Sequence, residues 1–260
     1  MHKTLLFVTG LAALVSACAW AADDPFAGTW KLNRDKSQIT GQVQRIKRMG
    51  GDKYEWSYGD SRVEIVTDGA DHPFQFGGTM SVKPEAPGKW VLTHKQNGQI
   101  VSIDTWSLSD GGRQWNSEMK GTRADGSSFT VQRTRTRMGS GSGFTGSWEL
   151  KNARYSAPID WVIKPYGREG LSFRWPQDKE QEDIKFDGQD YPDRGPRVAP
   201  GSTVSAKRID GRTIRTTDKL NGKIVETHQL KVSEDGGTLT DTIYVPGQQK
   251  PVIVVFEKQM

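Results

Sequence analysis

Two pairs of histidine and aspartate are the residues in this sequence best suited to chemistry. His94 and Asp104 flank one Asn-Gly dipeptide, and Asp218 and His228 flank another at matching positions. Asn-Gly strongly favours a tight β-hairpin, so each pair is expected on two neighbouring strands. An imidazole beside a carboxylate can take up and release a proton near neutral pH, which suits a general acid and base.

The hairpin register decides whether each pair can meet. Side chains alternate between the faces of a strand, so Leu92 and His94 share a face, as do Asp104 and Trp106. A two-residue turn would put these two sets on opposite faces, whereas a three-residue turn with a glycine bulge would put them together. Two polar surface hairpins would give the same pattern without any function, and both alternatives stay open.

The elements that must position these residues are short β-strands. Apolar and polar residues alternate between turn signals, and no window of twelve residues keeps a helical apolar stripe. The strands expected in the first half are 43–48, 54–58, 62–67, 79–83, 90–95, 100–108, 114–121 and 129–137. Those expected in the second half are 161–164, 171–175, 184–186, 204–208, 213–219, 224–232, 239–245 and 252–258. An antiparallel meander of this kind avoids exposed edges by closing into a barrel.

The chain is an internal repeat. The pattern Phe-x-Gly-x-Trp occurs at Phe26–Trp30 and returns at Phe144–Trp148, and three further matches follow in the same order in both halves. The flexible segment Gly139–Gly143 lies between the two copies. The expected organisation is a signal peptide at 1–21, a first barrel at 24–138, a Gly/Ser linker at 139–143 and a second barrel at 144–260.

Gly28-Thr29-Trp30 and Gly146-Ser147-Trp148, each on the first strand of its half, resemble the Gly-x-Trp signature of the lipocalins. The chain also resembles uncharacterised bacterial secreted repeat proteins of lipocalin-like type, for which membership implies no known chemistry. The lipocalin resemblance implies an all-β fold of two tandem antiparallel barrels. It further implies that each tryptophan plugs one barrel end, covered by a basic residue of the last strand. The expected pairs are Trp30 with Arg135 and Trp148 with Lys258.

Other tryptophans are candidates for a ligand pocket, because aromatic side chains inside a barrel can line an apolar cavity. Ordinary core packing is the alternative reading. The first half is richer in tryptophan, so a cavity is expected there first. The candidates are Trp56, Trp90, Trp106, Trp115, Trp161 and Trp175.

Several enzyme classes are excluded by missing motifs. The sequence has no His-Glu-x-x-His, no Gly-x-Ser-x-Gly and no P-loop. One cysteine and three histidines after the leader give no visible zinc cluster, so we expect neither a metal nor a cofactor. The segment Gln177–Asp183 is interpreted as a charged loop without function.

The first residues are expected to direct export. A basic start precedes an apolar core at 5–15 that is too short to span a bilayer. Ala19-Trp20-Ala21 predicts cleavage to a periplasmic or secreted protein, whereas the residues ending at Cys18 resemble a lipobox, which would give a lipidated outer-membrane protein. Without lipidation of Cys18 we expect no membrane association. The formal net charge of +5 favours anionic surfaces such as lipid headgroups but does not require nucleic acid.

Three functions follow from these observations. The leading one is an exported protein that binds a small apolar or amphipathic molecule without catalysis. The second is a hydrolase, isomerase or cyclase that uses a His/Asp pair within a barrel. The third is a structural or interaction protein of the cell envelope with filled barrels.

Overall fold

The computed structural model describes residues 24–157 and 159–259. They form an all-β structure, with a single 3-10 turn at Asp110–Gly112. The expected signal peptide and Cys18 lie outside the described residues. Within the described part of the chain, no helix is long and apolar enough to cross a membrane.

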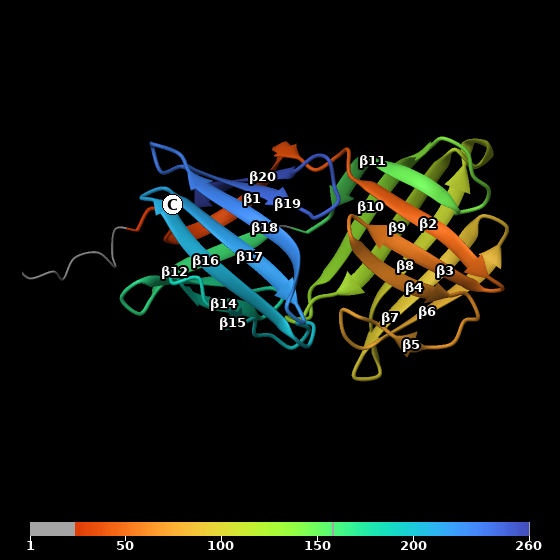
Figure 1. Ribbon diagram of the computed structural model, residues 1–260, viewed down its shortest axis with the longest axis horizontal. Coiled ribbons are helices and arrows are strands. Elements are labelled where there is room, and N and C mark those ends of the chain that lie inside the picture. The colour runs from red at the N-terminus through yellow and green to blue at the C-terminus, as the bar shows by residue number, and fades with distance from the viewer. Residues whose placement is uncertain (1–23, 158, 260) are drawn as a thin grey trace, which may run out of the picture.

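The strands form two antiparallel sheets of ten, each curled into a nearly closed barrel (Figure 1). Barrel N comprises β2 (Val43–Gly50), β3 (Lys53–Tyr58), β4 (Ser61–Val66), β5 (His72–Pro73), β6 (Thr79–Ala86), β7 (Lys89–Gln96), β8 (Gln99–Ser109), β9 (Gln114–Thr122), β10 (Ser128–Met138) and β11 (Gly146–Tyr155). Barrel C comprises β12 (Asp160–Tyr166), β13 (Gly170–Trp175), β14 (Glu180–Lys185), β15 (Tyr191–Pro192), β16 (Ser202–Asp210), β17 (Thr213–Leu220), β18 (Lys223–Val232), β19 (Thr238–Tyr244), β20 (Val252–Gln259) and β1 (Gly28–Gln38).

The alternating pattern located the strands well. Every strand expected from the sequence is present, usually with one to three further residues at its ends. The exception is β14, which begins at Glu180 and so includes most of the acidic part of the segment interpreted as a loop. That interpretation was wrong because charged residues are depleted in strands in general, yet this strand directs some of them into a polar interior.

The opening strands of the two halves are exchanged. β1 lies between β20 and β12, and β11 lies between β10 and β2. In Figure 1, orange β1 lies among the blue strands of barrel C, while green β11 lies in barrel N beside orange β2. Barrel N is therefore continuous in sequence, and barrel C is completed by a strand from the start of the chain.

The exchange changes the role of the Gly/Ser segment. Residues 139–143 belong to the hairpin between β10 and β11, where Met138 pairs with Ser147. The chain instead passes between the barrels at 39–42 and again between Tyr155 and Asp160. The sequence could not show this, because β1 and β11 carry the same motif and either one suits the same position in either barrel.

A cation covers each motif tryptophan, but the expected pairs were wrong. Lys258 Nζ lies 5.2 Å from the centre of the Trp30 ring, and Arg137 Cζ lies 4.1 Å from the centre of the Trp148 ring. Each basic residue stands directly opposite its tryptophan in the strand register. Arg135, two residues earlier, is buried against another indole, with Cζ 4.2 Å from the centre of the Trp115 ring.

The first copy of the motif shows what its other residues do. Trp30 Nε1 donates a hydrogen bond of 2.8 Å to the carbonyl of Phe26, so the phenylalanine four residues earlier satisfies a buried donor. Gly28 has a φ of +148°, and a Cβ there would lie 2.6 Å from Lys258 Cε. The glycine therefore lets the lysine stem cross the strand to reach the indole. The second copy repeats each contact.

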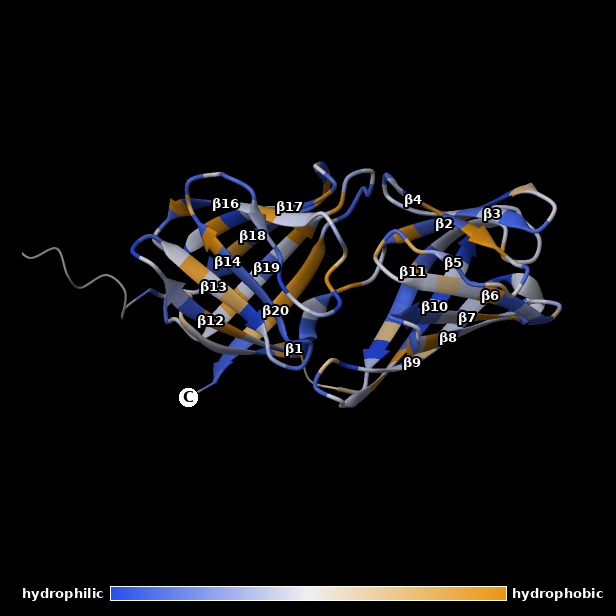
Figure 2. Cartoon of the chain, turned by 90° about the horizontal axis from the view of Figure 1, so that it is seen from below, coloured by the Kyte–Doolittle hydropathy of each residue, from blue (hydrophilic) through white to orange (hydrophobic). Residues whose placement is uncertain are grey.

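The barrel interiors differ in composition. Figure 2 shows hydrophobic and hydrophilic positions alternating along the strands of both barrels. The core of barrel N is largely aromatic, with the large buried side chains Trp90, Trp106, Trp115, Phe144 and Trp148. The core of barrel C is mainly aliphatic and phenylalanine-rich, and includes Phe26 and Trp30 from the exchanged end of the chain.

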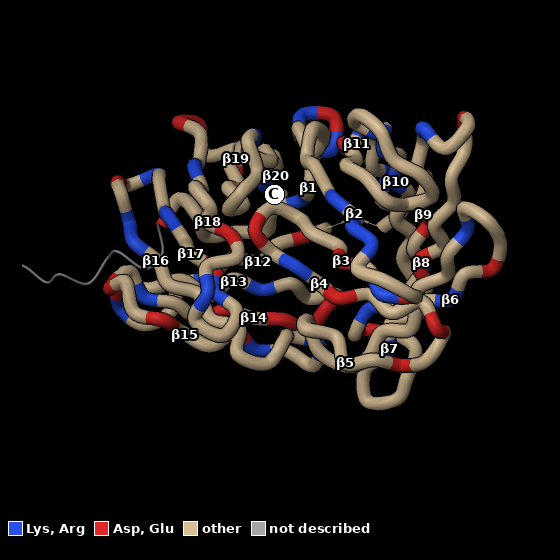
Figure 3. The backbone as a smooth tube through the Cα atoms, turned by 45° about the vertical axis from the view of Figure 1, so that its right-hand side comes forward, with Lys and Arg blue, Asp and Glu red and all other residues tan. Residues whose placement is uncertain are grey.

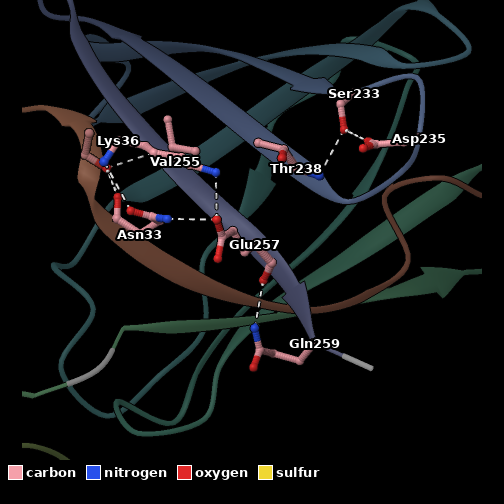
Figure 4. Close-up of polar contacts among 9 residues, drawn as sticks. Asn33, Lys36, Ser233, Asp235, Thr238, Val255, Glu257 and Gln259 are labelled. Atoms are coloured by element: carbon pink, nitrogen blue, oxygen red, sulfur yellow. Dashed lines mark hydrogen bonds and ion pairs between the residues drawn. The ribbon is translucent and has the colours of Figure 1, made fainter.

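Polar contacts fasten β1 to β20 (Figure 4). Asn33 Nδ2 and Lys36 Nζ lie 2.8 and 2.9 Å from Glu257 Oε1. The amide of Val255 donates to Ser37 Oγ at 3.0 Å. These bonds span a register shift between Asn33 and Gln38, where the regular ladder between the two strands is interrupted.

The two barrels contact each other beyond the crossing segments. Gln248, in the loop before β20, bonds both the amide and the carbonyl of Val43 through its side-chain amide, at 3.0 and 2.7 Å. Arg123 of barrel N forms an ion pair of 2.9 Å with Asp178 of barrel C. Specific bonds thus fix the relative position of the barrels.

Candidate functional site in barrel C

The hairpin of β17 and β18 brings the candidate residues of the second half onto one face. Its turn has two residues, Asn221 and Gly222, both with positive φ. A register shift between Asp218 and Lys219 then adds one residue to β18, so that Asp218 stands opposite Glu226. The short turn alone would have separated the two faces, but this bulge restores a common face.

The result is a histidine surrounded by carboxylates. His228 Nδ1 lies 2.9 Å from Asp241 Oδ2 of β19. His228 Nε2 lies 3.3 Å from Asp218 Oδ2 and 3.4 Å from Glu226 Oε2. The side chain of Asp241 is 1% exposed and that of His228 is 13% exposed. The structure therefore joins the predicted pair Asp218–His228 and adds two acids to it.

Aromatic rings form the neighbouring wall. Trp161 of β12 meets Trp175 of β13 edge to face, with ring centres 5.5 Å apart. Between this wall and the histidine lies a cavity of about 40 Å³. It is lined by Trp161, Phe173, Trp175, Glu182, Thr216, Asp218, His228 and Leu230. Trp161 and Trp175, two of the ligand candidates, are thus beside the polar cluster.

Burial and neighbouring charges strongly shift the pKa values of the side chains in this cluster. Burial alone would lower the pKa of His228, but Asp218, Asp241 and Glu226 together raise that pKa well above its ordinary value. Burial raises the pKa of Glu182 well above its usual range, and the charge of Asp218 adds to this shift. Figure 3 shows acidic positions on β14 and β18, the strands that carry Glu182 and Glu226.

Two further carboxyl groups of barrel C also have raised pKa values. Burial raises the pKa of Glu180 to about 7, with a further contribution from Asp178 and Asp193. Burial and the charge of Asp218 raise the pKa of Asp193 to about 6. Carboxyl groups that titrate near neutral pH can hold or pass protons.

Three of these residues could also hold a cation. One donor atom from each of Asp218, Glu226 and His228 lies within 4.8 Å of the others. The imidazole nitrogen and carboxylate oxygens suit a divalent transition metal. Asp241 would then be the outer carboxylate that orients the ring through Nδ1.

The matching pair in barrel N is not arranged in this way. His94 Nε2 lies 2.9 Å from the carbonyl oxygen of Gly77. Asp104 stands opposite Leu92, and burial raises the pKa of its carboxyl, opposed in part by Arg133 and Arg135. Among the described residues, His94 and Asp104 form neither a hydrogen bond nor an ion pair with each other, so only one of the two predicted pairs is joined.

The candidate tryptophans of the first half pack against one another. Trp90, Trp106 and Trp115 are 7%, 1% and 0% exposed. Trp56 meets Trp106 edge to face at 5.4 Å, and Trp106 lies 4.4 Å from Trp115 between ring centres. These side chains thus occupy the core of barrel N, where the sequence had suggested a cavity.

A much larger hollow lies between the barrels. It has a volume of about 840 Å³ and is bounded by the exchanged strands, the crossing segment and the start of β20. We call it the exchange groove. Its apolar lining residues are Leu32, Ile39, Leu150, Ala153, Tyr155, Ile159, Pro251, Ile253 and Val254, and its charged ones are Arg34, Lys151, Lys250 and Glu149.

Some site residues were missed from the sequence although signals existed. Asp241 occupies an inward position between Leu239 and Ile243, and a carboxylate on an otherwise apolar strand face is such a signal. Glu182 was assigned to a loop. The residues of the exchange groove had no signal, because the groove exists only through the strand exchange.

No protein-family model matches the chain, and a search of curated proteins finds no relative.

Proposed function

We propose that this exported protein binds a small amphipathic molecule with one acyl-type chain and an anionic head, and that the exchange groove holds it. The observation that carries this proposal is the size and lining of the groove. Its volume of about 840 Å³ falls in the range of about 300–1,000 Å³ typical of small-molecule sites. The 40 Å³ cavity beside His228 holds only an ion or a few waters.

The lining indicates the chemistry of the ligand. Leu32 of β1, Ile159 of the second crossing segment and Ile253 of β20 offer apolar surface. The charged lining residues are three basic side chains and one carboxylate, and Lys151 is already paired with Glu149 at 2.6 Å. Lys250, an exposed lining residue, remains well placed for a carboxylate or phosphate.

The location also supports binding. Ligand sites occur preferentially between domains, where two surfaces meet without full packing. The barrel resemblance to lipocalins suggests a carrier, but the aromatic core of barrel N leaves the groove as the larger space. The proposed ligand class is the one expected from the sequence, but the proposed site is the exchange groove between the barrels and not a barrel interior.

The test is displacement of a fluorescent fatty acid, dansyl-undecanoate, from the purified full-length protein. Dodecanoate and dodecyl phosphate should displace it, and dodecyl trimethylammonium should not. Ala153→Trp, which places an indole in the groove, should weaken binding strongly, and Lys250→Glu should weaken it about tenfold, equivalent to about 1.4 kcal/mol.

Lys47→Glu is the matched charge control, since Lys47 is exposed on β2 and does not line the groove. It should bind like the unmodified protein. Binding that persists in Ala153→Trp, or that prefers the cationic detergent, would refute the proposal.

A further inference from the structure

The cluster in barrel C contains a buried ring nitrogen that its neighbours do not satisfy. Asp241 holds His228 Nδ1 at 2.9 Å and so accepts that proton. The other nitrogen, Nε2, is buried and makes no hydrogen bond. Asp218 Oδ1 is also buried without a hydrogen-bond partner. Native proteins rarely leave such groups unpaired unless a ligand, ion or water completes them.

The spacing around Nε2 matches a coordination shell. Two ligands about 2.1 Å from a metal lie roughly 3.0–3.4 Å apart when the angle between them is octahedral or tetrahedral. The distances from Nε2 to Asp218 Oδ2 and Glu226 Oε2 are 3.3 and 3.4 Å. Both exceed the usual length of an N–H···O bond, about 2.7–3.2 Å. The two carboxylate oxygens thus lie where ligands of a bridging cation would lie.

The surroundings of His228 offer both room for a cation and acidic side chains to bind it. A cavity of about 40 Å³ touches His228, Asp218 and Glu182. A cavity of this size admits an ion with one or two waters. Three acidic side chains contact this one imidazole, an arrangement that suits a cation.

We propose that Asp218, Glu226 and His228 bind one divalent transition-metal cation, such as zinc or manganese, with Asp241 orienting the imidazole. The nitrogen ligand disfavours calcium and magnesium, which prefer all-oxygen sites. Three protein ligands leave at least one coordination position free, as in metal sites that bind water or substrate, and the cavity borders two of the three, Asp218 and His228. This site is separate from the exchange groove and does not depend on it.

The experiment uses the full-length protein stripped with EDTA and dialysed against Zn²⁺ or Mn²⁺. Elemental analysis should find one equivalent per chain, and Co²⁺ substitution should give the visible absorption of a coordinated ion. His228→Ala and Glu226→Gln should each weaken binding at least tenfold, and Asp241→Asn by about 10–100-fold, the range for outer carboxylates. Circular dichroism confirms that each variant is folded, and Glu226→Gln, at a half-exposed position, provides the test if His228→Ala does not fold.

His72 provides the matched control. It pairs with Asp68 at 3.0 Å on the surface of barrel N, so His72→Ala should leave binding unchanged. Absence of saturable binding of either metal at millimolar concentration would overturn the proposal. So would stoichiometric binding that survives both Glu226→Gln and His228→Ala, or a preference for Ca²⁺ or Mg²⁺.

Discussion

At the scale of single residues, the repeated motif is a set of contacts around one indole. The phenylalanine carbonyl accepts the indole N–H, the glycine clears a path, and a basic side chain lies over the ring. A cation over an indole gains about 0.5–2 kcal/mol, depending on its desolvation. Gly146 has a φ of +136°, and a Cβ there would meet Arg137 Nη1 at 2.8 Å.

Gly146→Ala should therefore lower the free energy of unfolding by about 1–3 kcal/mol, because the backbone becomes strained and the guanidinium is displaced. Urea denaturation followed by tryptophan fluorescence measures this. Gly237→Ala is the control, since its φ is not in the positive range and its Cβ would meet only the Asp235 carboxylate at 3.6 Å or more. A change of less than about 0.5 kcal/mol is expected there. Equal stability of the two variants would contradict this account of the motif.

At the scale of elements, β1 completes a barrel to which it is not adjacent in sequence. It covers one edge of β12 and one edge of β20, and it brings Phe26 and Trp30 into the core of barrel C. Removing it would expose two strand edges and open the interior. Barrel N lacks this dependence, because β2 to β11 follow one another along the chain.

A chain that begins at Ile39 should lose barrel C and keep barrel N. Amide hydrogen exchange read by mass spectrometry should show fast exchange in 160–259 and slow exchange in 43–155. A synthetic peptide of residues 24–38 should restore protection when added in trans. The same peptide with Trp30→Ala should not do so. Persistent protection of barrel C in the truncated chain would disprove the structural role assigned to β1.

Elements also show where sequence reasoning succeeds and fails. Period-two alternation and Asn-Gly turns located the strands because both signals are local. The bulge beside Asp218 could not be predicted from the sequence. One inserted residue changes which side chains of a strand point inward, but it leaves the composition of the strand unchanged. The pair Asp218–His228 was therefore one of two open alternatives. Its partner Asp241 lies on a further strand, and only the assembled sheet brings it to the ring.

At the scale of the whole molecule, the first and last strands of the described residues, β1 and β20, lie side by side. Thr29 near the start of β1 pairs with Gln259 at the end of β20. A short linker can therefore join the termini without moving a strand. The barrels could then be made continuous by opening the chain between β11 and β12, with the segment 39–42 as the remaining connection.

Such a circular permutant, beginning at Ile159, should form the same two sheets and refold faster. Each barrel would close from its own consecutive strands, which lowers the sequence separation of its contacts. Stopped-flow fluorescence after dilution from urea measures the rate, and the thermal midpoint checks that stability is kept. A permutant opened inside β8 serves as the control and should be destabilised. An unchanged refolding rate in the first permutant would show that closure by β1 does not limit folding.

The strands that pair with β1 are synthesised long after it, which affects how a newly made chain folds. Among the strands, a ribosome delivers β1 first, whereas β12 follows only after more than a hundred further residues and β20 is made last, so β1 has no native neighbour during that interval. Barrel N can assemble during that interval. Throughout it, the unpaired edges of β1 and the apolar side chains of Phe26 and Trp30 remain unprotected, and β1 can pair with another nascent copy. We therefore expect correct assembly to be more efficient when a chaperone covers β1 until β20 has been synthesised.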